Sequence, residues 1–170
     1  MKPTFEPVDI FELNENVFRL LDKDWMLITA GVTGNYNMMT ASWGGMGILW
    51  HHPVAFLFIR PQRHTYKFAE KYHHLTITFF SEEYRRILQT CGSKSGRDIN
   101  KMDIKGLTPV ETTSGAIAFE EARLVLECTK LYYDDIKPAH FIISDIDENY
   151  PLKDYHRMYI CKITKAYMKK

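Results

Sequence analysis

The sequence predicts a mainly β fold, a closed or split β-barrel with a few short helices. Six segments rich in β-branched and aromatic residues support this, and several alternate in polarity as half-buried strands do. No Ser/Gly/Pro tract, long charge run or repeat interrupts the 170 residues, so we expect a single domain over residues 1–170. Closure into a barrel is favoured because it removes exposed sheet edges.

The predicted strands follow one another along the chain. They are WMLITAG (25–31), PVAFLFIR (53–60), LTITFF (75–80), AIAFEEARLVLECTKLYY (116–133), HFIISDIDE (140–148) and HRMYICKITKAYM (156–168). Pro53 can open the second segment without interrupting its hydrogen-bond ladder. We expect His51 and His52 to lie in a solvated turn before it.

Two segments predict helices. TYKFAEKYH (65–73) has Thr65 as its N-cap, followed by good helix formers. In SEEYRRILQTCG (81–92), Ser81 can cap the helix, two glutamates occupy its positive end, and Gly92 offers a left-handed stop. The polar stretch 92–106 predicts a loop with one helical turn.

Composition argues against several classes of protein. The formal net charge of +1 gives no general attraction to nucleic acid or to an anionic membrane, so any basic site must be local. Three widely separated cysteines argue against a disulfide framework and suit a reducing compartment. The N-terminal segment lacks the apolar region of a signal peptide, and VAFLFI is too short to span a bilayer. We therefore expect a cytoplasmic protein.

The sequence predicts neither a metal site nor a nucleophilic catalytic residue. Adjacent histidines at 51–52 and 73–74 would point to opposite faces of a strand, and no H-E-x-x-H or paired-cysteine spacing occurs. GSKSG (92–96) has a lysine where a nucleophile elbow needs serine. Cys91 falls at a predicted helix C-terminus, where the dipole disfavours a thiolate, so we interpret it as a packing residue.

Three short stretches carry residues that suit a phosphate and a planar ring. They are TASW (40–43), IRPQRHT (59–65) and GSKSGRDINK (92–101). Together they offer hydroxyls, open backbone N–H groups and cations for a phosphate. Met38, Met39 and Trp43 could form a wall for the ring.

Each stretch also has a purely structural interpretation. The small residues of TAS are typical of a close crossing between barrel strands. Arg60 and Arg63 could be surface charges beside a turn, and the Ser/Gly stretch could be an ordinary loop. Taken singly, none of the three identifies a site.

Taken together, the chain resembles the flavin reductase-like proteins that bind FMN in a split β-barrel, and the flavoredoxin branch in particular. The resemblance rests on NMMTASWGG (37–45), PVAFLFIRPQRHT (53–65) and CGSKSGRDINKMDIKGLTPV (91–110), in this order and spacing. It extends from DWMLITAG (24–31) to the last predicted strand. It implies an FMN-binding domain that forms a homodimer, with the flavin near the subunit interface.

The resemblance also implies which residues hold the cofactor. The flavin would contact Met39, Thr40, Ala41, Ser42 and Trp43; the phosphate end would meet Arg60, Arg63 and Thr65; the closing loop would supply Gly92, Ser93 and Ser95, with Lys101 as the cationic contact. His156 stands near a histidine that many relatives have, but the glycine expected soon after it is absent.

The activity implied is that of an FMN-dependent oxidoreductase. NADH or NADPH would reduce the flavin, which would pass electrons to free flavin, a protein partner or another small acceptor. A first alternative is an electron carrier that binds FMN without nicotinamide turnover. A second is a small barrel that stacks nucleic-acid bases on Tyr and Phe, although the near-neutral charge argues against a nucleic-acid partner.

Overall fold

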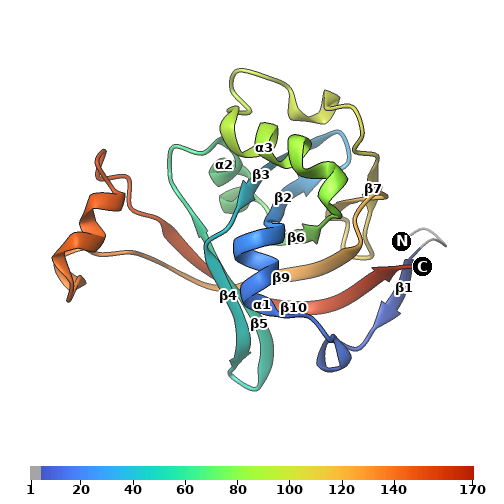
Figure 1. Ribbon diagram of the computed structural model, residues 1–170, viewed down its shortest axis with the longest axis horizontal. Coiled ribbons are helices and arrows are strands. Elements are labelled where there is room, and N and C mark those ends of the chain that lie inside the picture. The colour runs from blue at the N-terminus through green and yellow to red at the C-terminus, as the bar shows by residue number, and fades with distance from the viewer. Residues whose placement is uncertain (1–4) are drawn as a thin grey trace.

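The computed structural model describes residues 5–170, and its fold is mainly β with a few short helices, as predicted (Figure 1). The strands are β1 (Phe5–Val8), β2 (Met26–Val32), β3 (Asn35–Ala41), β4 (Gly44–Leu49), β5 (His52–Ile59), β6 (His74–Phe79), β7 (Pro109–Glu111), β8 (Ile117–Phe119), β9 (Leu124–Asp135) and β10 (Arg157–Lys169). The α-helices are α1 (Val17–Arg19), α2 (His64–Lys71) and α3 (Arg85–Ser93). A π turn (Leu20–Asp24) and several 3-10 turns complete the elements: Ile10–Glu12, Glu82–Tyr84, Lys101–Asp103, Pro138–His140 and Ser144–Asn149.

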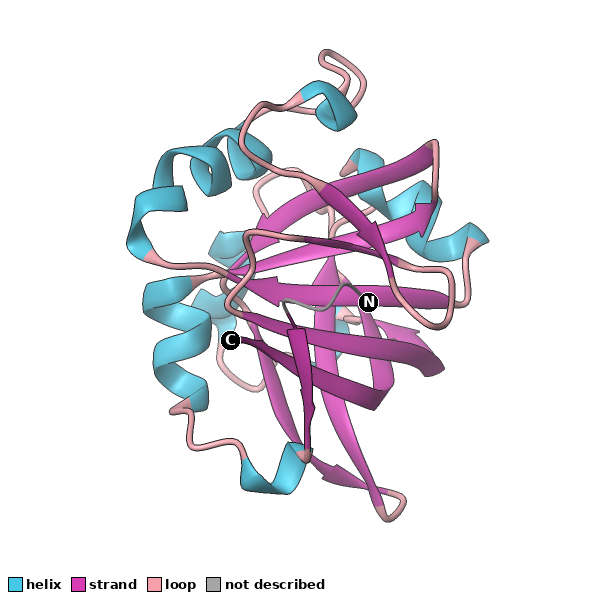
Figure 2. Ribbon diagram, turned by 90° about the vertical axis from the view of Figure 1, so that its right-hand side faces the viewer, coloured by secondary structure: helices cyan, strands magenta, loops and turns pink. Residues whose placement is uncertain are grey.

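Eight strands form one antiparallel sheet that is open at one corner. Seven of them follow the order β3-β2-β6-β9-β10-β5-β4, and β1 pairs with β10. β3 and β4 are consecutive in the chain, yet they stand at the two ends of this order. The strands therefore curve into a split barrel (Figure 2), and the short connection between β3 and β4 lies at its open corner.

Two apolar cores hold the sheet in place. One fills the barrel interior and includes Ile28, Leu57 and Ile77. The other lies between the sheet, α3 and the β7–β8 hairpin, and includes Leu27 and Leu88. Neighbouring residues of β2 thus enter different cores, which explains why this strand is apolar on both faces.

The long strands β9 and β10 continue beyond the sheet into an arm, residues 136–155, which projects away from the barrel at the left of Figure 1. The strand predicted over residues 140–148 is wrong, because this segment forms 3-10 turns. β9 and β10 pair with each other across their length, so no neighbouring strand is available to the apolar residues at the tip. Ile142, for example, is 100% exposed.

Both helix predictions are correct in place and wrong at their ends. α2 begins at His64 with Arg63 as its N-cap, because the Thr65 hydroxyl is instead hydrogen-bonded to the Asn37 amide at 2.7 Å. Ser81 makes no side-chain cap, since its hydroxyl donates to the Glu83 carboxylate at 2.8 Å. Gly92 is not a left-handed stop but lies inside α3, which ends at Ser93.

The remaining predictions about single residues concern cysteines and the turn before β5. Cys91 packs in the second core, where burial raises the pKa of its thiol to about 11. His51 lies in the β4–β5 turn, whereas His52 already pairs with Leu49 as the first residue of β5. Among residues 5–170, no helix is long and apolar enough to cross a membrane, and no cluster of three metal-binding side chains occurs.

Candidate functional site

A cavity of about 650 Å³ lies at the open corner, where β3 and β4 part. It brings together every residue of the predicted cofactor site except Gly92, although these residues come from three separate stretches of the chain. Gly92 lines an adjoining groove. Residues that line the cavity but were not assigned to the cofactor from the sequence are Phe58, Gln62, His64, Lys94, Gly96, Arg97 and His156.

The end of β3 forms one wall of the cavity and is fastened to α3. The Thr40 hydroxyl donates to the Leu88 carbonyl oxygen at 2.6 Å. A Cβ on Gly92 would lie 3.3 Å from the Thr40 Cβ, so glycine lets helix and strand approach closely. The two interpretations of TAS are therefore compatible, because the close crossing also shapes the cavity wall.

The cavity is lined by cationic side chains. The cationic residues of the lining are Arg60, Arg63, Lys94, Arg97 and Lys101, whereas burial and the nearby Arg97 lower the pKa of His64. Within residues 5–170, no aspartate or glutamate lines the cavity. In a chain of net charge +1, this local excess makes the cavity a site for an anion.

Lys101 is the buried cation of the site, with only 4% of its surface exposed. Its Nζ donates to the carbonyl oxygens of Met38 at 2.8 Å and Cys91 at 2.6 Å. Burial lowers the pKa of this amine to about 8. An ammonium group has three N–H donors, so a third remains for an anion in the cavity.

The N-terminus of α2 borders the cavity beside Arg63. The Arg63 guanidinium donates through Nη1 to the Gly92 carbonyl oxygen at 2.6 Å, which links this turn to the end of α3. The N-cap residue makes no side-chain capping bond, and the first residues of the helix, His64 and Thr65, line the cavity. The buried Nδ1 of His64 has no hydrogen-bond partner in the described part of the chain.

The Ser/Gly loop is fitted closely against its neighbours. A Cβ on Gly96 would overlap the Asn37 side chain and lie 2.9 Å from Cδ2 of His64. The Ser95 hydroxyl accepts from the Arg97 N–H at 3.1 Å, and Arg97 Nη1 donates to the Gln62 carbonyl oxygen at 2.9 Å. The loop therefore has little room for a side chain at Gly96.

Arg60 lines the cavity, but its hydrogen bonds are made with the arm. Nη1 donates to both carboxylate oxygens of Asp154, at 3.0 and 3.2 Å, and Nη2 donates to the Asn149 carbonyl oxygen at 2.8 Å. The guanidinium also lies 5.0 Å from the centre of the Tyr150 ring. Arg60 thus anchors the arm at the rim of the cavity.

His156 forms part of the cavity wall as a neutral ring. Its Nδ1 is 2.9 Å from the Tyr150 hydroxyl, and its ring centre is 5.4 Å from that of Trp43. Burial, together with the positive charge of Arg60, lowers its pKa to about 4. At neutral pH His156 therefore positions Trp43 without adding charge.

The missed residues had partial signals in the sequence. Lys94, Gly96 and Arg97 stand within the GSKSGRDINK stretch that was selected for phosphate binding. Phe58 lies on β5 between Leu57 and Ile59, which point into the barrel core, so alternation places its side chain on the other face.

Comparisons with known proteins agree with this fold. A family model described as "Flavin reductase like domain" matches residues 18–170. No curated protein matches the chain. Among solved structures, an FMN-binding protein from Thermus thermophilus with bound p-hydroxybenzaldehyde has 16% identity and a TM-score of 0.69, covering 95% of this chain and 77% of that chain.

Two flavoredoxins have similar structures. The protein from Methanosarcina acetivorans is 18% identical with a TM-score of 0.68, covering 96% of this chain and 77% of that chain. The protein from Desulfovibrio vulgaris (Miyazaki F) is 21% identical with a TM-score of 0.67, covering 86% of this chain and 69% of that chain. These likenesses show a common fold, and the family model covers most of the sequence. The chain therefore belongs to the flavin reductase-like domain family.

Proposed function

We propose that residues 1–170 form one domain that binds FMN in the cavity at the open corner and acts as an FMN-dependent oxidoreductase. The observation that carries this proposal is the cationic lining of the cavity, which has no acidic side chain in the described residues. Membership in the flavin reductase-like family supports the same cofactor, and solved proteins of this fold are described as FMN-binding.

The chemistry of the cavity fits both ends of FMN. For the phosphate, the cavity offers the buried ammonium of Lys101, the guanidinium of Arg63 and the positive end of α2, whose first residues line the cavity. For the ring, Met39, Trp43 and Phe58 offer an apolar and aromatic wall. Because Gly96 has no side chain, the Ser/Gly loop can pack against Asn37 and His64 beside the cavity.

When bound, FMN would supply hydride and electron chemistry that protein side chains lack. The chain's own residues would bind and orient it. Thr40 holds the cavity wall against α3, and His156 holds Trp43 through ring contact. Because His156 is neutral near pH 7, it would add no charge to the cavity. The positive charge would come from the cations at the phosphate end.

We further propose that NADH or NADPH is the electron donor and that a flavin, another small molecule or a protein is the acceptor. We also propose that the chain forms a homodimer with the flavin near the interface. Exposed aromatic residues beside β4 favour a partner there: Trp43, just before β4, is 48% exposed, and Phe18, on α1 against β4, is 85% exposed. Sedimentation equilibrium would test the dimer, and a monomer at all concentrations would contradict it.

The cofactor proposal can be tested with the purified protein. We expect a yellow protein that releases flavin absorbance on denaturation, or a colourless one that binds added FMN with a dissociation constant in the micromolar range or below. Anaerobic mixing with NADH or NADPH should then bleach the bound flavin. A protein that neither carries nor binds FMN would overturn the proposal.

The flavoredoxin-like structures favour a second function, that of an electron carrier. Such a protein would bind FMN but would not be reduced efficiently by either nicotinamide. Bleaching by a reduced ferredoxin, without bleaching by NADH or NADPH, would select the carrier over the reductase.

A further inference from the structure

The helix α2 reaches from the proposed FMN site to the base of the arm. At its first end, Arg63, His64 and Thr65 line the cavity. At its other end, Glu70 binds Arg157, the first residue of β10. The helix has only eight residues, and isolated helices this short are not stable in water. Contacts at its two ends therefore decide where its axis points.

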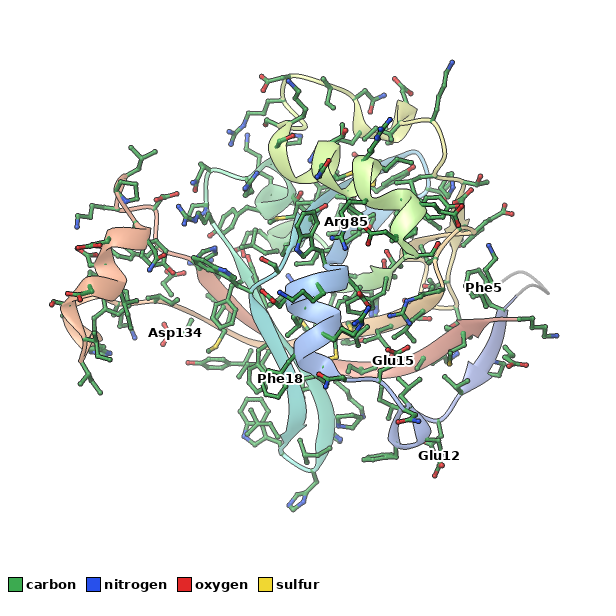
Figure 3. All side chains as sticks on the ribbon, in the orientation of Figure 1. Phe5, Glu12, Glu15, Phe18, Arg85 and Asp134 are labelled. Carbon is green, nitrogen blue, oxygen red and sulfur yellow. The ribbon has the colours of Figure 1, made fainter. Side chains whose placement is uncertain are left out.

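The Arg157 guanidinium joins α2 to both long strands. Nη1 donates to the Glu70 carboxylate at 3.0 Å, and Nε and Nη2 donate to the Asp135 carboxylate at 2.7 and 2.9 Å. Asp135 is the last residue of β9, and its neighbour Asp134, labelled in Figure 3, marks the base of the arm. The guanidinium also lies 5.5 Å from the centre of the Tyr66 ring of α2. A planar cation that binds two carboxylates in this way has a fixed orientation.

A second cation holds the last turn of α2. The Lys130 ammonium, on β9, donates to the Ala69 carbonyl oxygen and, at 3.4 Å, to that of Glu70. The last four carbonyls of a helix lack partners within the helix, so this ammonium satisfies two of them and lies at the negative end of the helix dipole. The buried Tyr159 of β10 also donates its hydroxyl to the Glu70 carboxylate.

These contacts lie outside the cavity. Glu70, Lys130 and Arg157 are not among the residues that line it, so none of them would touch the flavin. At the cavity end, the Thr65 hydroxyl is hydrogen-bonded to the Asn37 amide at 2.7 Å, which fixes the start of the helix. With one end fixed, the contacts at the other end set the direction of the helix axis.

We propose that Glu70, Lys130 and Arg157 are positioning residues for the phosphate of FMN. By holding the last turn of α2, they aim the positive end of this helix at the phosphate. At a rise of 1.5 Å per residue the helix is about 12 Å long, so a shift of its last turn changes the direction of its first turn. The inference rests on the proposed FMN site, because the helix dipole acts on an anion only close to the first turn.

The effect on the phosphate can be measured by comparing FMN with riboflavin, which has the same ring and no phosphate. The ratio of the riboflavin to the FMN dissociation constant, from quenching of flavin fluorescence, reports how well the phosphate is held. We expect Glu70→Gln and Lys130→Met each to lower this ratio at least fivefold and to change the riboflavin dissociation constant less than twofold. The two variants alter the charge of the protein in opposite directions, so a fall in both cannot come from long-range attraction of the phosphate.

Glu15→Gln is a matched control for Glu70→Gln. Arg123 also binds two carboxylates, those of Glu15 and Asp24, and none of these three residues lines the cavity. Glu15, labelled in Figure 3, comes just before α1. We expect Glu15→Gln to lower the melting temperature about as much as Glu70→Gln does and to keep the wild-type ratio. Glu70 is partly exposed, with 36% of its side-chain surface accessible, so Glu70→Gln tests the inference even if Lys130→Met unfolds.

The outcomes separate the inference from the proposed function. If the α2 variants are less stable but keep the wild-type ratio, their contacts only stabilise the fold and the inference is wrong. A ratio that rises in Glu70→Gln and falls in Lys130→Met would mean that charge, not position, is responsible. If riboflavin binds too weakly for a ratio, the phosphorus NMR resonance of bound FMN should shift in the α2 variants and not in Glu15→Gln, and an unshifted resonance would overturn the inference. A wild-type protein that binds no FMN would overturn the proposed function itself.

Discussion

Lys101 carries a buried ammonium group whose titration can be followed in two independent assays. In the ligand-free protein, burial lowers its pKa from 10.5 to about 8. The difference between these values corresponds to about 3 kcal/mol against the charged form in the folded state. Hydrogen bonds to the Met38 and Cys91 carbonyl oxygens offset only part of the lost hydration.

The sign of the pH dependence follows from proton binding. Between pH 8 and pH 10.5 the unfolded chain keeps a proton on Lys101 that the folded protein has released. Because the unfolded state then binds more protons, this group makes the free energy of unfolding rise with pH. From pH 7.5 to pH 10 we expect a rise of about 2 kcal/mol from Lys101 alone.

The measurement compares wild type and Lys101→Met by urea unfolding of the flavin-free protein at both pH values. The comparison is needed because burial raises the pKa of the Cys91 thiol to about 11, which makes stability fall with rising pH in both proteins. The difference between the two proteins reports Lys101 together with its coupling to Cys91, because the positive charge of Lys101 lowers the pKa of the Cys91 thiol. Equal pH dependence in wild type and Lys101→Met would refute the reasoning.

FMN binding gives the second assay for Lys101. A phosphate beside the ammonium favours its charged form, so FMN affinity should fall as the pH rises above about 8. A charge-assisted hydrogen bond is worth about 1.5–3 kcal/mol, so Lys101→Met should weaken FMN binding roughly 10- to 100-fold. Lys101→Arg keeps the charge and should lose the pH dependence. Unchanged affinity in Lys101→Met would remove this residue from the phosphate site.

Three further predictions concern the loop, the wall and the arm. Gly96→Ala should raise the FMN dissociation constant at least tenfold, because its Cβ would overlap the Asn37 side chain, and flavin fluorescence titration measures this change. Ser42→Asp should weaken FMN binding through charge repulsion, and equal affinity in Ser42→Asp and Ser42→Asn would place this residue outside the site. The half-buried ion pair between Asp154 and Arg60 should contribute about 1 kcal/mol. Asp154→Asn should therefore loosen the arm and speed its cleavage by trypsin about fivefold. Cleavage at the wild-type rate would mean that other contacts hold the arm.

The cavity could be predicted because three stretches, each of which packing or a loop could explain alone, occur together in the order and spacing of the flavin reductase-like proteins. The structure brings these stretches together at the open corner. Gly96 was missed because its role depends on contact with Asn37, some sixty residues earlier in the chain. No local pattern contains that information.

The arm was mispredicted for a related reason. Residues 140–148 have the composition of a strand, but β propensity mainly reflects packing against neighbouring strands. Here the neighbours are already paired with each other, so the isoleucines at the tip remain exposed. Arg60 was assigned to the phosphate from its place in the chain, yet its hydrogen bonds to Asp154 and Asn149 depend on the arm folding back to the cavity rim.

The open corner itself connects the fold to the proposed function. A closed barrel would pair β3 with β4, whereas in the described residues these strands are the two ends of the sheet. Unpaired edges are unfavourable unless something covers them. Gly45 and Gly47 have no side chains, so the surface of β4 is open at these positions. A Cβ on Gly47 would meet nothing within 4 Å. We therefore propose that two molecules cover this open corner: the flavin in the cavity, and a second copy of the chain along β4.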